Sequence, residues 1–120
     1  MSNAAPVEVW GIPTCGTTRK ALKHLEAKKL PHIFRNYREV RPSKKLLLDA
    51  MKSVSDPRKM FNTSGGSYRD GGYKDKAAAM TPAQIIDALL ADPMLIRRPI
   101  VKTPKGIVVG YDEGALSHIL

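Results

Sequence analysis

The fold of this chain is decided by the stretch Val7-Glu8-Val9-Trp10-Gly11-Ile12-Pro13-Thr14-Cys15-Gly16-Thr17-Thr18-Arg19-Lys20. Its first five residues predict a short buried strand, and Pro13 predicts a turn. The residues after Cys15 follow a helical pattern, whose apolar face continues through Ala21, Leu22 and Leu25. Cys15, the only cysteine in the sequence, is therefore expected at the beginning of a helix.

This position favours the thiolate form of Cys15. The first backbone N–H groups of a helix are unpaired and together carry about half a positive charge. The pKa of the Cys15 thiol is therefore predicted to lie below the value of about 8.5 of a free cysteine. Gly16 leaves room beside the sulfur, and the hydroxyls of Thr17 and Thr18 are candidate donors to the thiolate or to a bound anion. The alternative is that Cys15 is a small, unreactive buried residue.

The rest of the chain alternates between strand and helix signals. Residues 32–37 predict a second strand, which completes a β-α-β unit with parallel strands. Ser43, Pro57 and the capping box of Thr81 and Gln84 mark the beginnings of helices in a middle region of about 42–92. Within it, the polar, glycine-bearing residues 61–80 are interpreted as a connection between helices. Two antiparallel strands around a turn at 103–106 and a helix over 112–120 follow.

This order of elements predicts an α/β protein of thioredoxin-like fold, β-α-β and then β-β-α, with a helical insertion between its two halves. Residues 1–120 are expected to form one domain, in which residues 1–5 are left out of the fold because they are small and polar. In this fold an Xaa-Pro peptide bond in cis faces the cysteine. Arg98-Pro99 is the candidate, since the cis form costs only about 0.5–1 kcal/mol at proline.

The composition excludes several classes of protein. One cysteine forms no intramolecular disulfide, so a disulfide-stapled secreted domain is excluded. No apolar run approaches the roughly 20 residues that span a bilayer, and the expected location is the reducing cytoplasm.

His24, His32 and His118 are far apart in sequence, so no metal site is expected. His24 and His118 are interpreted as surface residues.

The net charge of +9 is carried almost entirely by residues 1–60, which hold 13 Lys and Arg against 5 Asp and Glu. Such a surplus suits an anionic substrate, an acidic partner or a nucleic acid. The cations occur as scattered pairs with few aromatic residues between them, and no nucleic-acid-binding signature accompanies them. A solvated basic surface is therefore favoured over nucleic-acid binding.

Three segments together resemble the ArsC/Spx family, which contains glutaredoxin-coupled arsenate reductases and their relatives. They are residues 10–15 (WGIPTC), 62–69 (NTSGGSYR) and 95–101 (LIRRPIV). The resemblance extends from about Val7 to the end of the chain. It implies a thioredoxin-like fold, Cys15 as the nucleophile and Arg98 as an anion-binding residue beside it.

The chain departs from the arsenate reductases of this family at two of the three arginines around their cysteine. Asn62 stands at one of these positions and Gly110-Tyr111 at the other, and Arg69 is a candidate substitute in anion binding. The Asn-Thr-Ser-Gly segment resembles an uncharacterised branch of the family more than the established reductases. Thr18 stands where Spx-type regulators carry the second cysteine of a Cys-x-x-Cys switch, so that switch cannot form.

The predicted function is a thiol oxidoreductase without a bound cofactor, in which Cys15 attacks a small oxyanion or a mixed disulfide. Because no second cysteine exists, an external thiol such as glutathione, with glutaredoxin as a partner, must resolve the covalent intermediate. The alternative is a non-enzymatic adaptor that binds a protein partner, as Spx-type regulators bind the α subunit of RNA polymerase.

Overall fold

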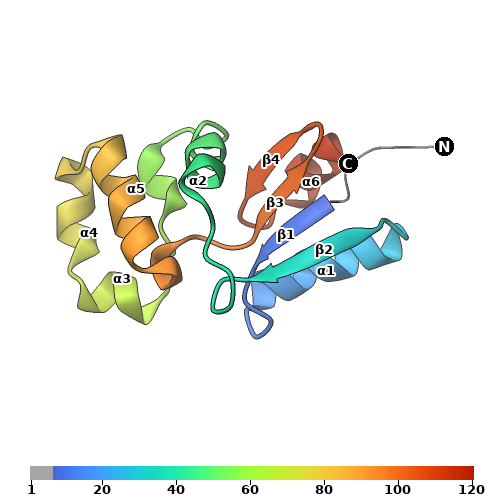
Figure 1. The fold of residues 1–120 in the computed structure, drawn as a ribbon, viewed down its shortest axis with the longest axis horizontal. Coiled ribbons are helices and arrows are strands. Elements are labelled where there is room, and N and C mark those ends of the chain that lie inside the picture. Colours follow the sequence, from blue (N-terminus) through green and yellow to red (C-terminus); the bar gives the residue numbers. More distant parts are fainter. Residues whose placement is uncertain (1–6) are drawn as a thin grey trace.

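A four-stranded sheet forms the centre of the structure, a computed structural model that describes residues 7–120. Residues 1–5, which were not expected to belong to the fold, lie outside the described residues. β1 and β2 are parallel, whereas β3 is antiparallel to both β1 and β4. This is the thioredoxin-like α/β arrangement that the sequence predicted. The strands are β1 (Val7–Gly11), β2 (His32–Asn36), β3 (Ile100–Thr103) and β4 (Gly106–Val109), in the order β2-β1-β3-β4 (Figure 1).

Helices α1 (Gly16–Ala27) and α6 (Glu113–Ile119) cover one face of the sheet (Figure 1). Because strand side chains alternate between the two faces, Val9 points to this side and meets Leu25 of α1 in a buried core. The next residue, Trp10, points to the opposite face, where the helical insertion completes a second core. None of the helices within residues 7–120 is both long enough and apolar enough to span a membrane.

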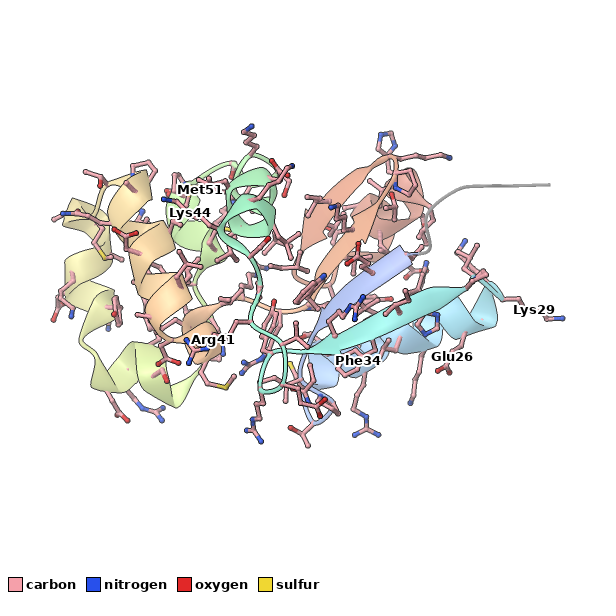
Figure 2. All side chains as sticks on the ribbon, in the orientation of Figure 1. Glu26, Lys29, Phe34, Arg41, Lys44 and Met51 are labelled. Carbon is pink, nitrogen blue, oxygen red and sulfur yellow. The ribbon has the colours of Figure 1, made fainter. Side chains whose placement is uncertain are left out.

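The predicted helical insertion lies beside the sheet (Figure 1). Its elements are α2 (Lys44–Met51), η1 (Pro57–Met60), α3 (Gly66–Asp70), α4 (Tyr73–Lys76), η2 (Ala77–Ala79), α5 (Pro82–Ala91) and η3 (Pro93–Leu95). The Ser43 side chain caps α2, and Thr81 and Gln84 form the predicted capping box of α5. Arg41 donates to the carbonyl oxygen of Leu90 at 3.1 Å and so ties the segment before α2 to the end of α5 (Figure 2).

The connection predicted over residues 61–80 is instead largely helical, since α3, α4 and η2 all lie within it. Its tyrosines provide apolar anchors: the ring centroids of Tyr68 and Tyr73 lie 5.7 and 5.3 Å from that of the buried Phe61. Gly72 adopts φ +70° between α3 and α4, a left-handed conformation that glycine takes at little cost. The prediction of a plain polar connection was therefore wrong, because aromatic packing stabilises these short helices.

His24 is not the surface residue that the sequence predicted. Its side chain is partly buried, its Nε2 atom is fully buried, and its ring lies edge-on to Tyr111 with centroids 6.4 Å apart. This contact forms because the chain after β4 packs against α1. Helical periodicity within α1 alone does not reveal such a long-range contact.

Candidate active site

Cys15 lies at the point where the turn after β1 ends and α1 begins. Its φ of −78° and ψ of 125° are those of an extended residue, which makes Cys15 the N-cap of α1. The Cys15 N–H donates to the carbonyl oxygen of Ile12 at 3.0 Å, and its own carbonyl oxygen accepts from the N–H of Arg19 at 3.0 Å. These two bonds close the turn and hold the sulfur at the positive end of the helix.

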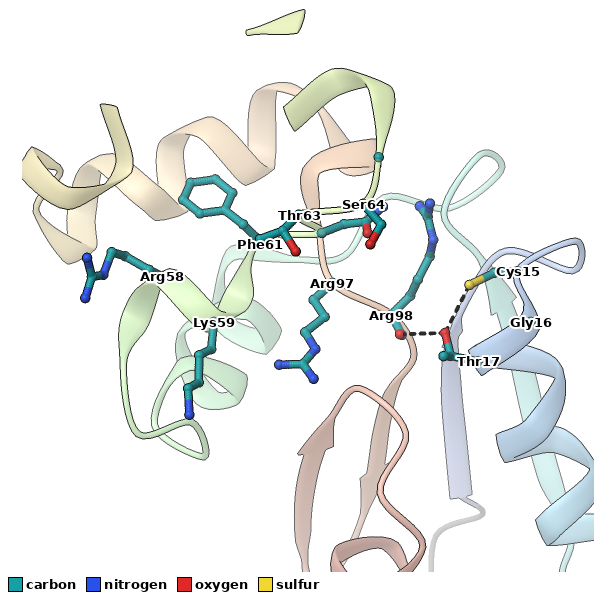
Figure 3. A pocket seen from close by; sticks show the side chains of 12 residues that line it. Cys15, Gly16, Thr17, Arg58, Lys59, Phe61, Thr63, Ser64, Arg97 and Arg98 are labelled. Atoms are coloured by element: carbon teal, nitrogen blue, oxygen red, sulfur yellow. Dashed lines mark hydrogen bonds between the residues drawn. The ribbon is translucent and has the colours of Figure 1, made fainter. Parts of the chain in front are cut away.

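Two threonine hydroxyls lie next to the sulfur. Thr17 Oγ1 lies 3.1 Å from Cys15 Sγ and donates to the carbonyl oxygen of Arg98, also at 3.1 Å (Figure 3). Thr18 is fully buried against Gly11, and its hydroxyl has no hydrogen-bond partner among residues 7–120. Both hydroxyls are therefore able to turn a proton towards a negatively charged sulfur.

The pKa of the Cys15 thiol is set by two opposing effects. Burial raises the pKa, but hydrogen bonds to the charged form outweigh burial. The donors are the Thr17 hydroxyl, the N–H and hydroxyl of Thr18, and the Arg98 side chain. Together they lower the pKa to about 6, so the thiolate is the main form at neutral pH. The sulfur is also partly exposed, which makes this thiolate accessible as a nucleophile.

The Arg98 side chain supplies a cation beside the sulfur (Figure 3). Its Nη1 atom is buried and has no hydrogen-bond partner in the described part of the chain. A buried donor without an acceptor is costly, and a bound anion would supply the acceptor. Behind it, the hydroxyl of the buried Tyr37 donates to the carbonyl oxygen of Arg97 at 3.4 Å. The Arg98-Pro99 peptide bond is cis.

A cavity of about 680 Å³ opens in front of Cys15. Pockets for small molecules have volumes of about 300–1,000 Å³. Among the lining residues that the structure describes, four are cations and none is acidic. One of these cations, Arg58, is compensated by Asp56, which does not line the cavity; Arg58 Nη2 and Asp56 Oδ2 lie 2.7 Å apart. No three His, Cys, Asp or Glu side chains within residues 7–120 are grouped as metal ligands would be. The cavity is lined by Cys15, Gly16, Thr17, Arg58, Lys59, Phe61, Asn62, Thr63, Ser64, Gly65, Arg97 and Arg98.

Most of the residues that the sequence predicted for the site come together in the structure. The predicted residues in the cavity wall are Cys15, Gly16, Thr17 and Arg98. Thr18 lies behind the sulfur, where it contacts Cys15 but is closed to solvent.

Arg69 is the exception. It is exposed on α3 and does not line the cavity. The preceding residue, Tyr68, packs on Phe61, so the side of α3 that carries Tyr68 faces the interior of the insertion. Because successive residues on a helix point in different directions, Arg69 is turned to solvent, and its predicted place in the anion site is not supported by this geometry.

Sequence reasoning missed three cations of the cavity, namely Arg58 and Lys59 of η1 and Arg97. Arg97 adjoins Arg98 in the segment that carries the family resemblance, which is the one local signal for it. The sequence does not show that the segment with Arg97 lies beside the end of η1 and pairs with it. The Arg97 N–H donates to the carbonyl oxygen of Met60 at 2.8 Å, and the Asn62 N–H donates to that of Leu95 at 2.7 Å.

Comparisons with known proteins identify the family to which this sequence is similar. The model of the ArsC family matches residues 10–119. The uncharacterized protein YusI of Bacillus subtilis is 39% identical over 104 residues, which are 84% of this chain and 86% of YusI. Arsenate reductase ArsI2 of Synechocystis is 31% identical over 102 residues, which are 84% of this chain and 71% of ArsI2.

A solved structure extends the similarity to the fold. The crystal structure described as that of a possible arsenate reductase from Streptococcus mutans UA159 superposes with a TM-score of 0.83 at 30% identity, covering 94% of this chain and 98% of the other. The family resemblance predicted from the three segments is thereby confirmed. With a family model that matches residues 10–119 and a cysteine at the beginning of α1, this chain belongs to the ArsC family.

Proposed function

We propose that the protein is a thiol-dependent oxidoreductase whose nucleophile is the sulfur of Cys15. The observation that carries the proposal is the lowered pKa of a partly exposed thiol that faces a basic cavity. Membership of the ArsC family supports the same class of reaction, since several relatives are named arsenate reductase. In this proposal Cys15 is the catalytic residue and Arg98 binds the developing negative charge.

With a disulfide as substrate, the reaction is a thiol–disulfide exchange. The Cys15 thiolate attacks one sulfur of the substrate, a new disulfide forms between Cys15 and that half, and the other half leaves as a thiolate. An external thiolate then attacks the mixed disulfide and releases Cys15. This step leaves a disulfide between the external thiol and the substrate half, which a second external thiolate reduces. Two electrons thus pass from two external thiols to the substrate, and Cys15 returns to its initial state.

The external thiol is required because the sequence offers no second cysteine. Glutathione, alone or with glutaredoxin as the thiol donor, has the chemistry to resolve the mixed disulfide. The reaction therefore belongs in a reducing compartment such as the cytoplasm, where such thiols are kept reduced. No bound cofactor takes part in the proposed cycle.

A small oxyanion such as arsenate is the second substrate class that this site would accept. The Cys15 sulfur would attack arsenic, a protonated oxygen would leave as water, and external thiols would supply the two electrons. Arg98 with its unpaired buried Nη1 and the beginning of α1 support anion binding. Asn62 and Gly110 offer no further cation at the two positions where the family resemblance implies arginines.

The proposal is tested by measuring the rate of Cys15 alkylation by iodoacetamide as a function of pH. Because the chain has one cysteine, the signal has one source. We expect a midpoint near the pKa of about 6. The same preparation should reduce bis(2-hydroxyethyl) disulfide with glutathione, and the Cys15→Ser variant should lose this turnover. Arsenate added to either assay tests the oxyanion as competitor and as substrate.

The adaptor alternative predicts the opposite outcome in the same experiment. An alkylation midpoint at or above about 8.5, with equal turnover by wild type and Cys15→Ser, would overturn the oxidoreductase proposal. Binding to the α subunit of RNA polymerase that is unaffected by Cys15→Ser would then support the adaptor.

A further inference from the structure

The cavity has a second basic end, on the side away from Cys15. Figure 3 shows the Arg98 side chain on the side of the sulfur. The Arg97 side chain extends in the other direction, on the side of Lys59 (Figure 3). The segments of these two cations are paired through the hydrogen bond from the Arg97 N–H to Met60. Arg97 and Lys59 both lie in the wall at this end of the cavity, and both are exposed residues.

The Arg97 guanidinium lies against the backbone of Gly110. A Cβ atom at position 110 would lie 2.7 Å from Arg97 Nε and 2.9 Å from Nη2, so the guanidinium occupies the space of an absent side chain. The backbone of Gly110 is itself fixed, with φ +84° and its N–H bonded to the carbonyl oxygen of Pro99 at 2.7 Å. Because glycine has no side chain, the Arg97 guanidinium can approach the backbone at position 110 closely.

Like Arg98, the cations Arg97 and Lys59 are not compensated by an acidic side chain among residues 7–120. Neither forms a salt bridge within residues 7–120, whereas Arg58 is bound by Asp56. The Lys59 ammonium donates to the neutral Ser55 hydroxyl at 2.8 Å. Two uncompensated cations on one wall, in a cavity without an acidic lining residue, favour a second negatively charged group on the ligand.

The size of the cavity agrees with such a ligand. A tetrahedral oxyanion held by Cys15 and Arg98 fills only a small part of about 680 Å³. The remaining volume leads to Arg97 and Lys59. A ligand that reaches from Cys15 to Arg97 and Lys59 needs two groups: a sulfur that Cys15 can attack, and an anionic group several bonds away from that sulfur.

We propose that Arg97 and Lys59 form a second anion subsite, which binds a carboxylate of the disulfide substrate while its sulfur lies at Cys15. The inference rests on the proposed oxidoreductase function and names its substrate class: disulfides of carboxylate-bearing thiols. The exchange step is unchanged, because Cys15 bonds to one half of the disulfide and the other half leaves as a thiolate. Arg97 and Lys59 position the substrate and take no part in bond making.

The test compares two disulfides that differ in charge, dithiodipropionate with its carboxylates and the neutral bis(2-hydroxyethyl) disulfide. The second-order rate constant for loss of the Cys15 thiol is measured for each at low ionic strength. The wild type should react faster with the anionic disulfide. Arg97→Gln and Lys59→Gln should each lower the anionic-to-neutral rate ratio about three- to tenfold.

The matched control is Lys28→Gln, which removes the same charge at the opposite end of α1 from Cys15. Its rate ratio should equal that of the wild type. A ratio unaffected by Arg97→Gln and Lys59→Gln, or lowered equally by Lys28→Gln, would overturn the subsite. Failure of the proposed function itself would look different, since the wild type would then react with the neutral disulfide no faster than free cysteine does.

Discussion

A single hydroxyl proton links the state of Cys15 to the backbone around it. Thr17 Oγ1 has one proton and two acceptors, the carbonyl oxygen of Arg98 at 3.1 Å and the Cys15 sulfur at 3.1 Å. With the thiol protonated, the S–H donates to Thr17 and the hydroxyl donates to Arg98. When the thiol ionises, the hydroxyl proton is drawn to the sulfur, so the bond that joins α1 to the segment before β3 weakens.

Thr17→Val tests this role, because valine keeps the shape of threonine and lacks the hydroxyl. We expect the pKa of Cys15 to rise from about 6 by about one unit, since the largest of the hydrogen bonds that lower it is lost. The pKa is measured from the ultraviolet absorbance of the thiolate against pH. Thr17→Ser retains the donor and should keep a pKa near that of the wild type. An unchanged pKa in Thr17→Val would show that Thr17 is not a donor to the thiolate.

The lowered pKa of Cys15 also predicts a pH dependence of stability. The unfolded chain holds its thiol proton up to a pKa of about 8.5, whereas the folded protein releases it near pH 6. The free energy of unfolding therefore rises with pH between these values, and this contribution is lost as the pH falls through about 6. Because the sulfur is partly exposed, we expect about 1–2 kcal/mol relative to Cys15→Ser, measured by urea unfolding across this window. Parallel curves for the two proteins would contradict the prediction.

At the level of elements, the site depends on how closely β1 approaches α1. Gly11 ends β1 directly against Thr18 of α1, and a Cβ atom at position 11 would lie 2.5 Å from Thr18 Oγ1. Thr18 is fully buried, and both its N–H and its hydroxyl act to lower the pKa of the Cys15 thiol. A side chain at position 11 must therefore displace the residue that supports the sulfur.

Gly11→Ala is expected to lower the free energy of unfolding by about 1–3 kcal/mol, the usual cost of overpacking. The pKa of Cys15 should rise at the same time. The control is Gly16→Ala in the first turn of α1, where a Cβ atom would meet nothing within 4 Å. This change should raise the free energy of unfolding by about 0.4–1 kcal/mol, because alanine restricts the unfolded chain. The free energies of unfolding of both variants are measured by urea unfolding. Equal destabilisation by Gly11→Ala and Gly16→Ala would contradict the close contact between Gly11 and Thr18.

The elements that the sequence predicted correctly are those with local signals. The beginnings of α1, α2 and α5 are determined by residues beside them, among them Ser43 and the box of Thr81 and Gln84. The short helices α3 and α4 were missed because their stability comes from Tyr68 and Tyr73 packing on Phe61. The presence of Arg97 in the cavity was missed for the same physical reason, since its guanidinium lies against Gly110, which is remote in sequence.

At the scale of the whole molecule, the cavity lies where the two halves of the fold and the insertion meet. Cys15 comes from the first half, Lys59 from the insertion, and Arg98 from the segment that leads into β3. Trp10 and Ile100 of the sheet share a buried core with the helices of the insertion. The geometry of the site is therefore maintained only while the sheet and the insertion remain packed together.

We accordingly propose that the chain unfolds as one domain, as its length and element order predicted. Urea unfolding followed by the fluorescence of Trp10 and by far-ultraviolet circular dichroism should give coincident transitions. Leu89→Ala in the insertion and Leu25→Ala on the other face of the sheet both remove fully buried side chains. Each should lower the free energy of unfolding by about 2–5 kcal/mol and shift both signals together. If Leu89→Ala moved one transition and Leu25→Ala another, the insertion would be a separate unit, and the cavity could open without global unfolding.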